Sequence, residues 1–174
     1  MREVLLQTRR FRVERLEYHI PGQGMVRREL VVHPGAVTIV PLLDSETVVM
    51  IRNYRFAAGA ELLELPAGTL EPPEPPMECA ARELEEETGY KAAQLERLCE
   101  FYTTPGFTDE RMYVFVGTGL TPTRQRLEAT EQIRIEIMPL NDALAATTDG
   151  RIVDGKTIAS LHVYHHRYRS GDKP

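Results

Sequence analysis

The chain has 174 residues, of which 42% are hydrophobic and 27% are charged, and both values are ordinary for a soluble globular protein. This length suits one domain with a real core, and the formal net charge of −5 argues against a general nucleic-acid binder, which would show a basic patch. No apolar run approaches the roughly 18 residues of a membrane helix. Charged residues also interrupt the start of the chain, so no signal peptide is expected.

The first third of the chain reads as strands. Apolar and polar residues alternate over residues 11–20 and 25–33, with the turn-forming "PGQG" between them, which predicts a hairpin or two neighbouring strands. Residues 36–43 are almost continuously apolar, and residues 47–55 follow after a turn, so we expect two buried strands there. A short strand over 61–68 should lead into a loop.

A helix is predicted over residues 77–88, because the preceding prolines are tolerated in a first helical turn but not further inside. Its apolar residues recur at steps of three and four and should form one core-facing stripe: Met77, Ala80, Ala81, Leu84 and Thr88. Gly89 should cap its end. Later strands are expected over 95–103, 111–119 and 133–140, and helices over 142–147 and 156–169. Together these elements predict an α/β or α+β fold with helices packed against a mixed sheet.

The two cysteines, Cys79 and Cys99, have no metal-ligand spacing. We interpret them as buried free thiols in a reducing compartment rather than as a disulfide. The sequence therefore predicts a cytoplasmic protein without a nucleic-acid or membrane partner.

The predicted helix ends in an acidic cluster, "RELEEETG" over residues 82–89. Carboxylates are disfavoured there, because the carboxyl end of a helix carries the negative pole of its dipole. Three of them, Glu83, Glu86 and Glu87, share one face, while Glu85 should point into solvent. Such oxygen ligands suit Mg²⁺ or Mn²⁺, and the plainer alternative is a solvated acidic face.

The spacing around this cluster favours the metal site. Residues 68–90, "GTLEPPEPPMECAARELEEETGY", resemble the Nudix box G-x5-E-x7-R-E-U-x-E-E-x-G-U, where U is a bulky apolar residue. Every fixed position is filled, and Tyr90 at the last U is the one departure from the usual aliphatic residue. The resemblance implies an α/β/α sandwich around a mixed sheet, and hydrolysis of a nucleoside diphosphate linked to another group.

The resemblance also implies roles for the residues of the box. Two or three Mg²⁺ (or Mn²⁺) ions would be bound by four groups: Glu83, Glu87, Glu86 and the backbone carbonyl of Ala67. Glu74 and Arg82 would form a structural ion pair, and Gly68 and Gly89 would serve the backbone geometry of the loop and the cap.

Motifs outside the box resemble the ADP-ribose pyrophosphatase group. They are "HPGAV" (33–37), "RNYR" (52–55), "ELPAG" (64–68) and "YTTPGFTDE" (102–110), and Pro105 stands at the marker position sixteen residues after Gly89. This implies cleavage of ADP-ribose to AMP and ribose 5-phosphate by a homodimer with exchanged N-terminal strands. Residues 1–33 would be that strand extension, and residues 34–174 the Nudix hydrolase domain.

Further substrate contacts follow from this resemblance. Arg52 and Arg55 would grip the diphosphate, and the loop carrying Pro105, Gly106 and Glu110 would line the site. Arg27 and Glu29 would reach the substrate of the partner subunit, and Tyr18 or Ile20 would cover the adenine. The general base would come from a late acidic loop, as Glu131 or alternatively Glu128.

Two other functions remain open on the sequence. The residues of the box would act only on the diphosphate and do not distinguish the base or the sugar. The substrate could therefore be another nucleoside-diphosphate sugar, such as a GDP-hexose or an ADP-sugar. A domain that senses a nucleotide sugar without cleaving it is the alternative from another class. Such sensors commonly lose glutamates of the box, whereas this chain keeps them.

Overall fold

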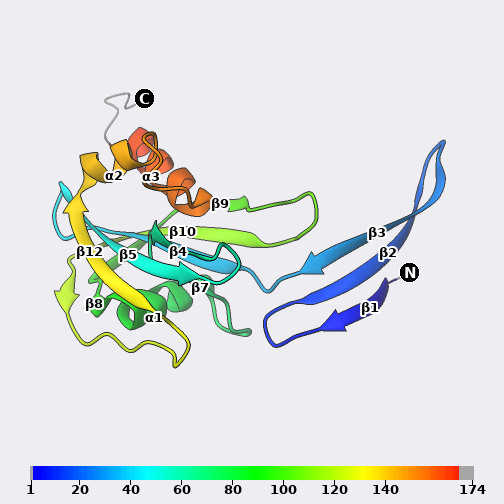
Figure 1. Cartoon of the computed structure of the whole chain (residues 1–174), viewed down its shortest axis with the longest axis horizontal. Coiled ribbons are helices and arrows are strands. Elements are labelled where there is room, and N and C mark those ends of the chain that lie inside the picture. The colour runs from blue at the N-terminus through cyan, green and yellow to red at the C-terminus, as the bar shows by residue number, and fades with distance from the viewer. Residues whose placement is uncertain (1, 169–174) are drawn as a thin grey trace.

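The computed structural model describes residues 2–168, and its main body has three layers (Figure 1). Helix α1 (Pro76–Thr88) covers one face of the central strands, and helices α2 (Leu140–Ala146) and α3 (Gly155–Tyr168) cover the other. The central strands form a mixed sheet in the order β7-β4-β10-β9. In it β4 pairs parallel with β10, and the other pairs are antiparallel. Their bounds are Ala67–Thr69 (β7), Ala36–Pro41 (β4), Arg111–Thr118 (β10) and Gln94–Tyr102 (β9).

A second, antiparallel sheet has the order β12-β5-β6, and two short strands, β8 and β11, pair with each other. Their bounds are Ile133–Pro139 (β12), Thr47–Arg55 (β5), Ala60–Glu64 (β6), Tyr90–Lys91 (β8) and Thr121–Pro122 (β11). The expected segment over 61–68 is thus divided between β6 and β7. The short strands β8 and β11 were not predicted, whereas the helices and the remaining strands of the body lie close to where the hydrophobic pattern predicts them.

Strand β4 explains why the body is a sandwich, because every one of its residues is buried. Alternate side chains of a strand point to opposite faces. Val37 and Ile39 pack in a cluster with Leu84 of α1, whereas Val40 packs in a second cluster with Leu161 of α3. A strand that is apolar at consecutive positions must be covered on both faces. The predicted α/β/α arrangement is confirmed.

Helix α1 begins and ends as the sequence predicts. Pro76 stands in its first turn, and Gly89 adopts a left-handed conformation at φ 64°, with its N–H donating to the carbonyl of Glu85. The predicted core-facing stripe is partly wrong, because Met77 is 50% exposed and Ala81 is also exposed. Ala80, Leu84 and Thr88 are buried as predicted, together with Cys79 and Glu87, so the helix is rotated to turn a glutamate inward.

A third sheet, in the order β1-β2-β3, projects from the body (Figure 1). Its strands are Arg2–Gln7 (β1), Arg12–Ile20 (β2) and Gly24–Val32 (β3), of which the alternating pattern did not predict β1. The base of the sheet is fastened to the loop after β9, since the N–H of Val31 donates to the carbonyl of Phe107 at 2.8 Å. Large apolar side chains of this sheet stay exposed: Val4, Leu5, Leu6, Tyr18 and Met25.

Within residues 2–168, every helix is too short or too polar to cross a membrane. Cys79 is buried, Cys99 is partly buried, and both are free thiols, as expected.

Candidate active site

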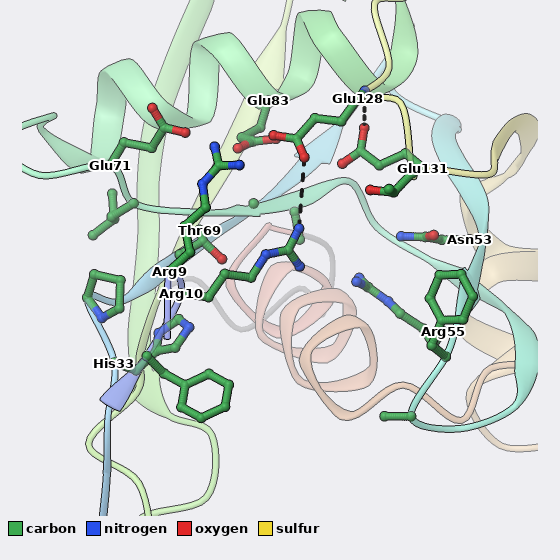
Figure 2. A pocket seen from close by; sticks show the side chains of 18 of the residues that line it. Arg9, Arg10, His33, Asn53, Arg55, Thr69, Glu71, Glu83, Glu128 and Glu131 are labelled. Carbon is green, nitrogen blue, oxygen red and sulfur yellow. Dashed lines mark hydrogen bonds and ion pairs between the residues drawn. The ribbon is translucent and has the colours of Figure 1, made fainter. Parts of the chain in front are cut away.

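A cavity of about 910 Å³ opens beside the end of α1 (Figure 2). Segments far apart in the sequence form its walls: the turn between β1 and β2, the β3–β4 connection, the end of β5, strand β7 with the following loop, α1, and the loop before β12. Five carboxylates line it: Glu71, Glu83, Glu87, Glu128 and Glu131. Such a concentration of acidic groups in a concave site is typical of cation-assisted chemistry.

Glu87 is held in place by the strand that α1 packs against. Its side chain is almost fully buried, and the backbone N–H of Ala67 donates to its Oε2 at 2.8 Å. Burial raises the pKa of Glu87 to about 8, although the hydrogen bond from Ala67 and the positive charge of Arg55 act in the opposite direction. The site thus positions a carboxylate whose charge is poorly compensated by protein groups alone.

Glu83 reaches the same cavity one turn earlier on the helix. Burial raises its pKa to about 7, against the opposing effect of Arg82. Its carboxyl group crosses β7 at Gly68, where a Cβ atom would lie 1.9 Å from Glu83 Cδ. Glycine at this position is therefore a requirement of the close approach between the strand and the carboxylate.

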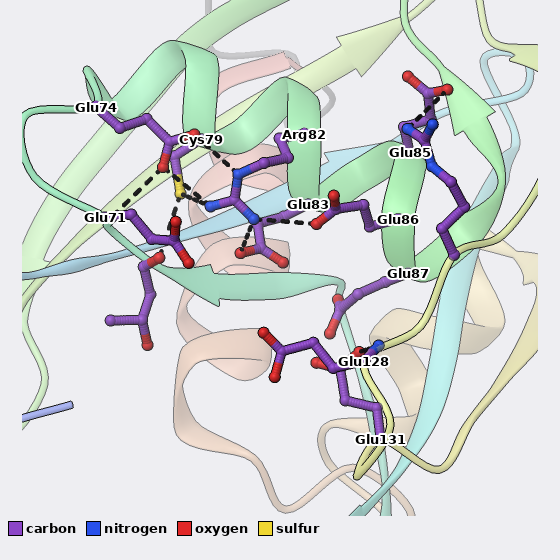
Figure 3. Close-up of polar contacts among 12 residues, drawn as sticks. Glu71, Glu74, Cys79, Arg82, Glu83, Glu85, Glu86, Glu87, Glu128 and Glu131 are labelled. Carbon is purple, nitrogen blue, oxygen red and sulfur yellow. Dashed lines mark hydrogen bonds and ion pairs between the residues drawn. The ribbon is translucent and has the colours of Figure 1, made fainter. Parts of the chain in front are cut away.

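Arg82 organises the outer side of the acidic cluster (Figure 3). Its guanidinium donates to both oxygens of Glu74 at 2.9 Å, to Glu83 at 2.8 Å and to Glu86 at 3.0 Å. The expected pairing of Arg82 with Glu74 is present. Glu86 is turned toward Arg82 and is not among the cavity-lining residues of the described chain. Glu85, expected in solvent, is half-buried and forms an ion pair with Arg126 at 3.3 Å.

The loop before β12 is tied to the end of α1. Gln125 Nε2 donates to the carbonyl of Glu87 at 2.7 Å, and the N–H of Arg126 donates to the carbonyl of Glu86 at 2.9 Å. These bonds satisfy carbonyls that a helix end leaves unpaired. They also bring Glu128 and Glu131 to the cavity wall, where the N–H of Glu128 donates to Glu131 Oε2 at 2.8 Å.

The carboxylates fit a divalent cation by their chemistry. Among the described residues, no group of three or more His, Cys, Asp or Glu side chains stands in a ready-made metal geometry. Mg²⁺ normally takes only one or two protein carboxylates and fills its other positions with water and phosphate oxygens. Glu83 and Glu87, both buried and both with raised pKa values, would gain from a cation that favours their charged forms.

Arg55 and Arg52 point to opposite faces of β5. Arg55 lines the cavity and donates from Nε and Nη2 to the buried Glu64 at 2.9 and 2.6 Å. Lys156 of α3 pairs with the same glutamate and fixes it from behind. Arg52 instead pairs with Glu136 of β12 and lines neither cavity, because an odd separation along a strand reverses the side-chain direction.

A second cavity of about 620 Å³ adjoins the first and shares Arg55 and residues 67–69 with it. Glu110 lines this second cavity and accepts a hydrogen bond from Thr103 Oγ1 at 2.5 Å. Pro105 and Gly106 are exposed and line neither cavity.

Arg27 and Glu29 lie on β3 and make their contacts inside the N-terminal sheet. Arg27 pairs with Glu17 at 2.5 Å, and Glu29 pairs with Arg15 at 3.0 Å. Neither residue lines a cavity of its own chain.

The sequence analysis gave no role to several cavity residues, although some of them stand inside the motifs that it quoted: Arg9, Arg10, Phe11, His33, Asn53, Thr69 and Glu71. The sequence of the β1–β2 turn did not mark its arginines as site residues, because two arginines in a polar turn are usually ordinary surface residues. Only the docking of the N-terminal sheet brings them to the site. Glu71 could have been noticed, since it stands inside the loop of the Nudix box.

Comparison with known proteins agrees with this geometry. The family model described as the NUDIX domain matches residues 32–161. The chain is 38% identical over 147 residues to the ADP-ribose pyrophosphatase of Bacillus subtilis (strain 168), covering 83% of this chain and 80% of that protein. It is 37% identical over 147 residues to a methanol dehydrogenase activator of Bacillus methanolicus, with the same coverage of 83% and 80%.

The solved structure of an ADP compounds hydrolase superposes on the chain with a TM-score of 0.81 and 25% sequence identity. The match covers 96% of this chain and 91% of that one. The chain therefore belongs to the NUDIX family. It is an enzyme of the Nudix hydrolase class, as its box predicts.

Gly68→Ala tests the close approach of β7 and Glu83. The added methyl group must displace the Glu83 carboxyl, which is at the end of a flexible side chain, so the fold should persist. Hydrolytic activity should fall on the order of 100-fold, because a small misplacement of a reacting group has that effect. Gly117→Ala is the control, since its Cβ would make only ordinary contacts at 3.5 Å and Gly117 lines neither cavity. Equal activities of the two variants in a steady-state assay would contradict the assignment.

Proposed function

We propose that the enzyme hydrolyses the diphosphate bond of ADP-ribose, giving AMP and ribose 5-phosphate, with Mg²⁺ (or Mn²⁺) as cofactor. The observation that carries the proposal is the placement of Glu83, Glu87 and Arg55 around one cavity large enough for a nucleotide sugar. The names of the Bacillus subtilis relative and of the solved ADP compounds hydrolase support the choice of an ADP compound.

The protein groups divide the task of handling the diphosphate. Arg55 donates hydrogen bonds from Nε and Nη2 to Glu64, so its Nη1 could donate to a phosphate oxygen of the substrate. Two or three divalent ions, when bound by Glu83, Glu87, Glu86 and the Ala67 carbonyl, would neutralise the diphosphate and activate the attacking water. Arg82 and Glu74 keep these carboxylates oriented and take no direct part in the reaction.

A carboxylate must take the proton of the attacking water. We propose Glu131 for this role and keep Glu128 as the alternative, because both line the same cavity as the helix carboxylates Glu83 and Glu87. Water adds to one phosphorus atom, the bridging P–O bond breaks, and the two phosphates leave as AMP and ribose 5-phosphate.

The N-terminal sheet supports a homodimer. Its exposed apolar side chains, including those of β1, in which every residue is exposed, are poorly explained by a single subunit. We propose that this sheet exchanges with a second copy. Arg27, Glu29 and the covering residue Tyr18 or Ile20 would then serve the partner's adenosine pocket. The free thiols of Cys79 and Cys99 support a cytoplasmic location.

Product analysis tests the function directly. ADP-ribose, ADP-glucose, GDP-mannose and dGTP would be incubated with the enzyme, with and without Mg²⁺, and the phosphate products separated. AMP and ribose 5-phosphate should appear from ADP-ribose only with metal. Preferential cleavage of GDP-mannose or ADP-glucose would move the specificity to another nucleotide sugar. Binding without cleavage of any of them would support the sensor.

Glu87→Gln tests the metal site. The variant should keep its fold and lose roughly a hundredfold or more in turnover, because metal-assisted stabilisation of the transition state is worth several kcal/mol. It should also lose the rise in melting temperature that added Mg²⁺ gives to the original protein. Glu85→Gln is the matched control, since Glu85 pairs with Arg126 away from the cavity. Near-normal turnover in Glu87→Gln would rule out this metal ligand.

The general base can be identified by two parallel variants. Glu131→Gln should lower kcat by about 10²–10⁴-fold with a small change in KM, as expected for a lost proton acceptor. Glu128→Gln should have the smaller effect. If the order of the two effects is reversed in single-turnover assays, Glu128 is the base.

Removal of residues 1–33 tests the exchanged dimer. The shortened protein should run as a monomer in light scattering and should bind ADP-ribose more weakly, while circular dichroism checks that the body remains folded. An unchanged dimer with unchanged affinity would refute the exchange.

A further inference from the structure

The turn between β1 and β2 is a well-formed element of the catalytic cavity. Thr8 closes it: its Oγ1 accepts from the N–H groups of Arg10 and Phe11 at 3.2 and 3.0 Å, and donates to the carbonyl of Phe11 at 2.7 Å. The N–H of Thr8 also donates to that carbonyl at 2.9 Å. The turn therefore presents Arg9 and Arg10 from a fixed backbone.

Both arginines extend into the cavity, on the side of Glu83 and Glu128 (Figure 2). Arg9 makes no hydrogen bond or ion pair to the residues that the structure describes. Arg10 has one distant ion pair, 3.9 Å to Glu128, between two exposed side chains. Such a pair contributes little. Neighbouring Arg12, by contrast, is engaged by the buried Glu14.

The cavity thus has two separate places for an anion. Arg55 stands at the end of β5 and is anchored by Glu64, whereas Arg9 and Arg10 approach from the N-terminal sheet on another wall (Figure 2). A guanidinium group matches a phosphate with two parallel hydrogen bonds. ADP-ribose has a single diphosphate, and the proposed function already assigns it to the helix carboxylates, their cations and Arg55.

We propose that Arg9 and Arg10 form a phosphate subsite for a group outside the diphosphate that is cleaved. The preferred substrate is then a nucleoside-diphosphate sugar that carries a further phosphate ester on a ribose hydroxyl. This inference rests on the proposed function, since it adds a specificity element to the same site. The reaction is unchanged: water cleaves the diphosphate, and the extra phosphate ester stays on its ribose.

The test compares ADP-ribose with ADP-ribose phosphorylated at the 2′-hydroxyl of the adenosine ribose. Each would be assayed with the full-length enzyme and Mg²⁺, and the readout is the ratio of the two KM values. The phosphorylated substrate should have a KM about tenfold lower, as expected for charge-assisted hydrogen bonds. The double variant Arg9→Ala/Arg10→Ala should bring this ratio close to one, and the double lysine variant should restore part of it.

Arg28→Ala is the matched control. Arg28 is an exposed arginine of β3 whose Nη1 donates to the carbonyl of Arg27, and it lines neither cavity. It should keep the preference for the phosphorylated substrate, which separates a local contact from a general loss of positive charge.

The outcomes separate the inference from the function. If ADP-ribose is cleaved but the two KM values are equal, or if the double variant keeps their ratio, the subsite is refuted and the function stands. If both KM values rise together in the double variant, the arginines hold the cleaved diphosphate, which also refutes it. If neither compound is cleaved, the proposed function fails. The subsite is then tested by calorimetry, through the ratio of the Kd values of the two compounds.

Inorganic phosphate alone is the last arm. Suppose that phosphate inhibits cleavage of ADP-ribose by the original enzyme but not by the double variant, and that the original enzyme has equal KM values for the two substrates. The arginines would then bind free phosphate, and the proposed substrate preference would be overturned.

Discussion

The contact between the last turn of α1 and strand β7 determines the rest of the site. Glu87 is anchored by the N–H of Ala67, and Glu83 passes over Gly68, where a Cβ atom would overlap the Glu83 carboxyl group. Both contacts need the helix rotated so that a glutamate, and not only apolar residues, faces the sheet. That rotation leaves Met77 and Ala81 in solvent, which the apolar periodicity alone would not have chosen.

Carboxylates at the carboxyl end of a helix are disfavoured by the helix dipole, and neighbouring groups partly offset this cost. Arg82 bonds Glu74, Glu83 and Glu86, and the loop before β12 donates to the carbonyls of the last turn through Gln125 and Arg126. The compensation is incomplete, because burial still raises the pKa values of Glu83 and Glu87. Functional sites commonly retain such destabilised groups, and a bound cation would relieve them.

Positive charge is distributed around the cavity in a complementary way. Glu64 is fully buried between Arg55 and Lys156, so α3 and the end of β5 hold one guanidinium in a fixed orientation. A buried glutamate with only one of these partners would be costly. Arg9 and Arg10, in contrast, are supplied by a turn whose position depends on how the N-terminal sheet meets the body. The body therefore supplies one guanidinium group to the cavity, and the N-terminal sheet supplies two more.

The sequence by itself determined most elements of the body and, through the box on its acidic helix, the family to which the chain belongs. Hydrophobic periodicity and turn residues act locally, and the residues of the Nudix box are close together in the chain, so their spacing is visible without coordinates. The tertiary structure decided everything that depends on side-chain direction and on distant contacts. It turned Arg52 away from the cavity toward Glu136, brought Arg55 into it, and placed the β1–β2 turn on its wall. The physical reason is that a strand reverses its side chains at every residue, and that the docking of one sheet on another is fixed by contacts between residues far apart in sequence.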